Sequence, residues 1–206
     1  MQNSLANFFS PRGVAIIGAS SNPEKLSHGI LKNMVQYGYT GGIYPVNPGS
    51  TSIEVKNPQT GSIHNLACYT DVSLVPDPVD LAVIVLPAKY VLQVVENCGK
   101  RGIKDITIIS GGFKEAGEEG ISREKELLAI AEKYNIRLIG PNCVGTVDLY
   151  SGLNTTFIHG LPARGPIGFL SQSGAIIGGV IDYIIGKGGG FSKIVSMGNE
   201  DRKSVV

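Results

Sequence analysis

The segment with the clearest chemical potential is a turn of small residues that follows a short apolar run. Residues 14–17 are apolar, and Gly18, Ala19, Ser20 and Ser21 come directly after them. Small side chains let a ligand approach the backbone, and free N–H groups at the start of a following helix favour an anion. The serine hydroxyls add further donors. We interpret the turn as a phosphate cradle, with a simple tight strand-to-helix turn as the alternative.

The same turn lacks two features of a dinucleotide-binding fingerprint. That fingerprint needs further glycines, and here Ser20 and Pro23 stand in their places. It also needs a carboxylate at the end of the second strand to bind the ribose hydroxyls. That strand ends in Tyr44-Pro-Val-Asn-Pro48, which contains no acid. We therefore expect a nucleotide-like ligand other than NAD(P), which disfavours an NAD(P)-dependent oxidoreductase.

Alternating apolar and amphipathic segments predict the elements that position this turn. We expect strands at residues 14–17, 43–46, 81–86, 106–109 and 137–139, and helices at residues 25–37, 89–100 and 122–134. Because these strands are apolar throughout, they indicate an α/β fold with a Rossmann-like parallel sheet and helices on both faces. Residues 50–65 are polar and rich in turn formers, and we expect an exposed loop there.

The pattern breaks within residues 148–166 and then starts again. A strand is expected at residues 167–170, a helix at 175–185 and a strand at 193–195. We predict a Rossmann-like domain over residues 1–147, followed over residues 148–206 by a linker and an incomplete second α/β unit. Two strands and one helix are too few to bury a core of their own. The second unit either leans on the first or is the front of a longer protein.

Composition narrows the class of protein. The chain has 206 residues, of which 42% are hydrophobic and 17% charged, which is typical of a packed globular protein. A net charge of +1 gives no general attraction to nucleic acid or to a membrane surface, and no apolar run reaches the length of a bilayer span. Cys68, Cys98 and Cys143 fit neither a disulfide framework nor a metal site, so we expect a cytoplasmic protein without a metal. Cys143 is expected to be a buried packing residue.

Six short segments occur in a characteristic order along the chain. They are VAIIGAS at residues 14–20, IYPVNP at 43–48, DLAVIVLP at 80–87, ISGGF at 109–113, GPNC at 140–143 and SQSG at 171–174. Together they resemble the CoA-binding domain and the start of the second domain of NDP-forming acyl-CoA synthetases. The ADP-forming acetate–CoA ligase type is more similar than the α subunit of succinyl-CoA synthetase. The resemblance implies that the second unit is an incomplete flavodoxin-like, succinyl-CoA synthetase-like α/β unit.

The resemblance also implies coenzyme A as the cofactor and assigns parts of it to particular positions. The phosphates would lie at the first loop, the nucleotide end near the second strand, and the pantetheine arm near the later strands. All of these positions follow strand carboxyl ends, where open parallel sheets bind their ligands. The implied cofactor-binding residues are Gly18, Ala19, Ser20, Ser21, Asn47, Pro87, Ser110 and Gly111.

The last of the six segments joins a predicted strand to a predicted helix. Ser173 and the backbone N–H groups near Gly174 would form an oxyanion or phosphate pocket. The alternative is a helix N-cap, and the resemblance makes us favour the pocket. No residue is assigned a catalytic role, because none of His28, His64 and His159 stands at the family's phosphohistidine position. His28 is expected at a solvated helix end, with a contact to the ligand at the phosphate loop as the alternative.

In the complete family system, acyl-CoA, phosphate and ADP interconvert with the acid, CoA and ATP. The sequence stops before the phosphohistidine region and lacks the ATP-grasp portion. We therefore expect a truncated form that binds CoA or acyl-CoA but has no activity alone, with an ATP-grasp β subunit or domain as its partner. The alternative is a stand-alone CoA-binding module with a regulatory or scaffold role. The downstream reading frame distinguishes the two.

Overall fold

The computed structural model describes residues 5–160 and 162–199, and its main feature is a five-stranded sheet in the order β2-β1-β5-β6-β7. The strands are β1 (Gly13–Ile17), β2 (Gly42–Val46), β5 (Leu81–Ile84), β6 (Asp105–Ile108) and β7 (Arg137–Ile139). All neighbouring pairs are parallel, which confirms the predicted parallel sheet. Since β2 and β5 flank β1 on opposite sides, the chain changes direction across the sheet between β1 and β5.

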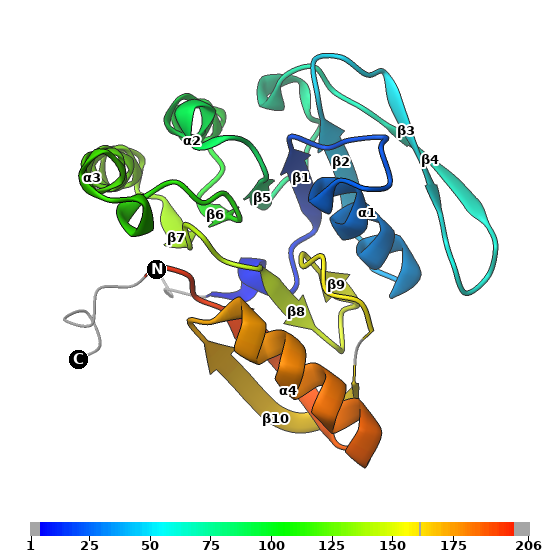
Figure 1. Cartoon of the computed structure of the whole chain (residues 1–206). Coiled ribbons are helices and arrows are strands. Elements are labelled where there is room, and N and C mark those ends of the chain that lie inside the picture. Colours follow the sequence, from blue (N-terminus) through cyan, green and yellow to red (C-terminus); the bar gives the residue numbers. More distant parts are fainter. Residues whose placement is uncertain (1–4, 161, 200–206) are drawn as a thin grey trace.

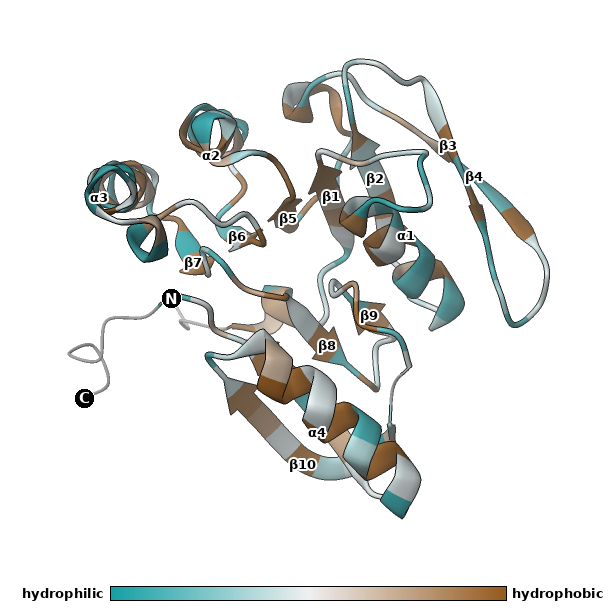
Figure 2. Cartoon of the chain, in the orientation of Figure 1, coloured by the Kyte–Doolittle hydropathy of each residue, from teal (hydrophilic) through white to brown (hydrophobic). Residues whose placement is uncertain are grey.

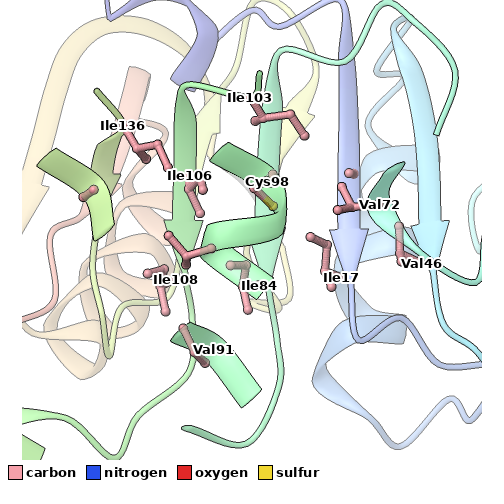
Figure 3. Close-up of a cluster of buried hydrophobic side chains, with 14 of the residues drawn as sticks. Ile17, Val46, Val72, Ile84, Val91, Cys98, Ile103, Ile106, Ile108 and Ile136 are labelled. Carbon is pink, nitrogen blue, oxygen red and sulfur yellow. The ribbon is translucent and has the colours of Figure 1, made fainter. Parts of the chain in front are cut away.

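Helices cover both faces of this sheet, as predicted (Figure 1). The helix α1 (Leu26–Gln36) lies on one face, while α2 (Ala88–Arg101) and α3 (Glu118–Tyr134) lie on the other. Figure 3 shows Ile84, Ile106 and Ile108 of the sheet with Val91 and Cys98 of α2 in one of the two resulting cores. Within the described residues, no helix combines the length and the apolar character that crossing a membrane requires.

The expected exposed loop at residues 50–65 is wrong, because a β-hairpin occupies most of it. The strands β3 (Ser52–Lys56) and β4 (Ile63–Ala67) pair antiparallel, with Ile53 opposite Leu66. Ile53 and Val55 are fully buried in the core on the α1 side of the sheet. Their polar neighbours Glu54 and Lys56 are exposed, so the segment alternates with the period of a half-buried strand. Its overall polarity concealed that alternation.

A second, four-stranded sheet has the order β10-β11-β8-β9. The predicted strand, helix and strand are confirmed as β10 (Ala163–Ser171), α4 (Gly174–Lys187) and β11 (Gly190–Ser196), and β8 (Thr146–Asp148) and β9 (Leu153–Asn154) join them. The chain therefore enters the second sheet at Thr146. The sheet and α4 enclose a small core, and Figure 2 shows further apolar residues along α4 and β10.

The second unit leans on the first through hydrogen bonds to its backbone carbonyls. Thr146 Oγ1 donates to the carbonyl of Phe8 at 3.0 Å, and Ser151 Oγ donates to that of Phe9 at 2.7 Å. In the other direction, Asn33 Nδ2 of α1 donates to the carbonyl of Thr156 at 2.7 Å. The first two bonds hold β8 and the turn after it against residues 8 and 9, and the third holds the segment after β9 against α1.

Candidate functional site

A cavity of about 880 Å³ opens at the carboxyl ends of β1, β2, β5 and β6. Residues 17–20, 46–48, 85–87 and 109–111, which span the ends of these strands, line it together with parts of α2. The strands all point to the same edge, and the chain changes direction between β1 and β5. The loops after these two strands therefore diverge, which is the usual place for a ligand in an open parallel sheet.

The loop after β1 begins with a glycine that no other residue could replace without strain. Gly18 has a φ of +89°, and a Cβ at this position would lie 2.3 Å from the carbonyl oxygen of Val85. The N–H groups of Gly18 and Ala19 both point to the carbonyl of Val46, at 3.0 and 3.3 Å. The loop is thus fixed between the ends of β2 and β5.

The next two residues present backbone donors that the protein does not use. Within residues 5–160 and 162–199, the backbone N–H groups of Ser20 and Ser21 have no protein acceptor. Ser20 Oγ accepts from the N–H of Asn22 at 3.1 Å and can still donate its own proton. The helix α1 follows with Lys25 as N-cap and no side-chain cap. Free N–H groups beside the positive end of a helix favour an anion.

Asn47 fixes this loop from the neighbouring strand. Its Nδ2 donates to the carbonyl of Ala19 at 2.6 Å, while its Oδ1 accepts from the N–H of Gly49 at 2.8 Å. Its own backbone N–H donates to the carbonyl of Tyr69 at 2.8 Å. Asn47 therefore positions the first loop, and its expected contact with the nucleotide end of a cofactor stays a prediction.

The remaining predicted residues lie on the β5 and β6 side of the cavity. Ser110 Oγ accepts from the N–H of Leu86 at 3.1 Å, which ties these two loops together. Pro87 is exposed at the start of α2, and Gly111 is exposed after β6. Of the predicted cofactor-binding residues, all but Ser21 line the cavity.

Beyond Gly111, a carboxylate organises the loop that leads away from the cavity. Glu115 Oε1 accepts from the N–H groups of Gly112 at 2.5 Å and Phe113 at 3.2 Å, and Oε2 accepts from the side chain of Asn199. Burial alone would raise the pKa of Glu115, but these hydrogen bonds hold it below its usual value. The carboxylate therefore stays ionised beside the loop, where the two units meet.

Residues 173 and 174 lie apart from this cavity. Ser173 is the N-cap of α4, and its Oγ accepts from the N–H of Ile176 at 3.4 Å. Neither Ser173 nor Gly174 lines the 880 Å³ cavity, and their phosphate-binding role stays a prediction.

Two further expectations concern nucleophilic side chains. Cys143 is 4% exposed, and burial raises its pKa to about 12, which confirms a buried packing residue. The solvated position expected for His28 is wrong, because its ring is buried with Nδ1 3.0 Å from the carbonyl of Ser20.

Several lining residues were not among those predicted. Lys25 lies at the start of α1, and Tyr90 and Asn97 lie on α2. Asp71 follows the hairpin. Tyr90 could have been found from its place in the first turn of the helix after β5. Asp71 could not, because the hairpin that leads to it was read as a loop.

Comparisons with known proteins agree with this geometry. The model of the CoA binding domain family matches residues 12–148, and that of the succinyl-CoA ligase like flavodoxin domain matches residues 164–205. The α subunit of acetate–CoA ligase [ADP-forming] II from Pyrococcus furiosus is 44% identical over 195 residues, covering 95% of this chain and 40% of that subunit. Acetate–CoA ligase [ADP-forming] I from Archaeoglobus fulgidus is 42% identical over 196 residues, covering 95% of this chain and 27% of that protein.

Solved structures give the same match. The protein PH0766 from Pyrococcus horikoshii OT3 superimposes with a TM-score of 0.86 at 41% identity, covering 97% of this chain and 44% of its own. The dinucleotide-forming acetyl-coenzyme A synthetase 1 from Ca. Korarchaeum cryptofilum was solved in complex with phosphate and ADP. It superimposes with a TM-score of 0.85 at 38% identity, covering 98% of this chain and 41% of its own. The chain therefore spans less than half of each of these relatives.

Proposed function

The chain belongs to the family of CoA-binding domains, and from this we propose that its 880 Å³ cavity binds coenzyme A for an ADP-forming acyl-CoA synthetase. The observation that carries the proposal is the position of the cavity. It lies where the chain changes direction across the sheet. At its first loop lie the N–H groups of Ser20 and Ser21, which have no acceptor among the residues that the structure describes. Such donors suit the diphosphate of CoA.

The lining of the cavity supports an extended ligand. We place the diphosphate at Ser20, which lines the cavity, and at the neighbouring Ser21, and the adenosine between residues 46–48 and 70–72. The pantetheine arm then runs past Pro87 to Ser110 and Gly111. In this arrangement the domain binds and orients the thiol, which lowers the entropic cost of the reaction rather than forming or breaking a bond.

The reaction that we propose for the complete system is the interconversion of acyl-CoA, ADP and phosphate with acid, CoA and ATP. Its support is the set of acetate–CoA ligase [ADP-forming] relatives, together with a 4-hydroxybutyrate–CoA ligase [ADP-forming] from Nitrosopumilus maritimus. The acyl groups in these names differ, so they do not fix one acid for this chain.

The division of labour within the chain is part of the same proposal. Residues 1–147 would serve as the CoA domain and residues 148–206 as the start of the ligase domain, with a phosphate pocket at Ser173 and Gly174. An ATP-grasp subunit or domain would supply the nucleotide, and the free cysteines suit a reducing cytoplasm.

The binding half of the proposal is tested by calorimetric titration of the chain with CoA, acetyl-CoA, NAD and NADP. We expect micromolar binding of CoA and acetyl-CoA and no binding of the two dinucleotides. Micromolar binding of NAD without a CoA signal would overturn the proposal.

The catalytic half is tested on the whole gene product that contains this segment. ATP should form from acyl-CoA, ADP and phosphate when acetyl-CoA and other acyl-CoA thioesters are supplied. A product that binds CoA but forms no ATP with any of them would make the chain a regulatory or scaffold module instead.

A further inference from the structure

A second cavity, of about 610 Å³, lies beside the first along α1. Glu24, Lys25 and Leu26 line both cavities, so a single short segment separates them. Apart from Pro23, the other lining residues come from three separate parts of the chain, which are α1, the hairpin and the segment after β9. The second cavity therefore exists only because the hairpin and that segment both pack against α1.

The lining of this second cavity is strongly cationic. Lys25 and Lys32 come from the start and the middle of α1, and Lys56 is the last residue of β3. Glu24 is the only carboxylate among the residues that line it. Two histidines, His28 and His159, complete the polar lining. Three ammonium groups against one carboxylate give the cavity a local positive charge in a chain whose net charge is only +1.

Within the part of the chain that the structure describes, no carboxylate pairs with these lysines. None of the ion pairs between described residues includes Lys25, Lys32 or Lys56. Elsewhere, carboxylates lie within 4.0 Å of several lysines, which are Lys100, Lys114, Lys133 and Lys193. Unpaired like charges that face one cavity repel one another, and a bound anion would remove that repulsion.

His28 connects the two cavities through the first loop. Its Nδ1 lies 3.0 Å from the carbonyl of Ser20, and because a carbonyl only accepts, Nδ1 is the donor. Ser20 lines the first cavity and His28 lines the second. An anion in the second cavity would therefore lie one hydrogen-bonded step from the proposed diphosphate site.

We infer that the second cavity is a subsite for a phosphate monoester and that the ribose 3′-phosphate of CoA occupies it. This inference rests on the proposed function. In CoA the 3′-phosphate and the 5′-diphosphate branch from one ribose. Two anion sites on either side of residues 24–26 match that branching. Inorganic phosphate carries the same chemistry, and the experiment separates the two sources.

The test compares CoA with dephospho-CoA, which lacks only the 3′-phosphate, by calorimetric titration of the chain. We expect dephospho-CoA to bind about tenfold more weakly. The variants Lys32→Gln, Lys56→Gln and their combination should weaken CoA binding several-fold and leave dephospho-CoA binding unchanged. Lys125→Gln is the matched control, because Lys125 is exposed on α3, across the sheet from α1. It should change neither affinity.

The outcomes separate this inference from the proposed function. Equal affinities for CoA and dephospho-CoA would overturn the 3′-phosphate subsite and leave CoA binding intact, whereas no binding of either ligand would overturn both. A double variant that weakens both ligands equally would also contradict the subsite. Titration with inorganic phosphate identifies the other source. One result would assign the cavity to free phosphate and not to CoA. In it, inorganic phosphate binds only when both Lys32 and Lys56 are present, while CoA and dephospho-CoA bind with equal affinity.

Discussion

The side-chain amide of Asn47 donates a hydrogen bond of 2.6 Å to the backbone carbonyl of Ala19. This bond ties the loop after β1 to the end of β2. The same side chain accepts from the N–H of Gly49 at 2.8 Å. One residue thus fixes the two loops on one side of the cavity. The loop that carries the Ser20 and Ser21 donors, unpaired within residues 5–160 and 162–199, keeps its shape before any ligand binds, which reduces the entropic cost of binding.

Asn47→Ala removes both of these hydrogen bonds and leaves the first loop without its support. We expect CoA affinity to fall about tenfold, since ordering the loop then has to accompany binding. Calorimetry measures the affinity, and circular dichroism shows that the fold is retained. Asn65→Ala, at an exposed position on β4, is the matched control and should bind CoA normally. Normal binding by Asn47→Ala would show that the loop needs no such support.

Ser20→Asp places a carboxylate where we expect the diphosphate. An aspartate can still accept from the N–H of Asn22, so the turn is preserved while like charges meet. We expect CoA affinity to fall about tenfold or more, with little change in melting temperature. Ser20→Asn has nearly the same shape without the charge and should bind much more tightly than Ser20→Asp. Equal affinity in the two variants would mean that the phosphates lie elsewhere.

Gly18→Ala tests the close approach of the first loop to β5. The added Cβ meets the carbonyl oxygen of Val85 at 2.3 Å, and φ is +89°. Gly38→Ala is the control, with a φ of +73° and no neighbouring atom within 4 Å. Urea unfolding should show a loss of about 1 kcal/mol for Gly38→Ala from backbone strain alone. The loss for Gly18→Ala should exceed it by about 1–3 kcal/mol because of the clash. Equal losses would contradict the tight packing.

An ion pair at the amino ends of β1 and β5 makes part of the stability of the fold sensitive to acid. Asp80 accepts from the backbone N–H of Arg12 at 2.8 Å and from its Nε at 2.9 Å, and the Arg12 guanidinium holds the pKa of Asp80 below its usual value. A lowered carboxylate pKa stabilises the fold above the unfolded pKa, and that stability is lost as the pH falls through the folded pKa.

Asp80→Asn should therefore lower the melting temperature by about 2–4 °C at pH 7. The difference from the unsubstituted chain should shrink as the pH falls below about 4, the pKa of the unfolded carboxyl, and vanish below the lowered pKa of the folded one. Asp77→Asn removes the exposed ion pair with Arg101 and is the control, with a smaller expected effect. A difference between Asp80→Asn and the unsubstituted chain that stays constant down to pH 2 would contradict the assigned role of the carboxylate.

The central sheet could be predicted because its inner strands β1, β5 and β6 are buried on both faces. Residues 14–17 and 81–84 are uniformly apolar, and the structure buries every one of them. The hairpin was missed because only Ile53 and Val55 of β3 are buried among polar neighbours. The strands β8 and β9 contain three and two residues, too few for any periodicity to appear. The strand β8 depends on pairing with β11, which is distant in sequence, and β9 depends on pairing with β8.

The candidate site could likewise be predicted in part. The resemblance implied that Ser20, Pro87 and Gly111 bind the cofactor, and they line one cavity because parallel topology brings strand carboxyl ends to one edge. The second cavity could not be predicted. It needs Lys56 of the hairpin and His159 of the segment after β9 to meet on α1, and neither placement follows from local pattern.

The central claim is that CoA binds at the loop after β1, and titration of ¹⁵N-labelled chain with CoA tests it most directly. We predict that the largest backbone amide shifts fall on Ser20 and Ser21, whose N–H groups have no acceptor among the described residues, with further shifts at Gly111. Amides of α3 and α4 should move little. Shifts confined to α4 and its flanking strands, with those of Ser20 and Ser21 unchanged, would contradict the account.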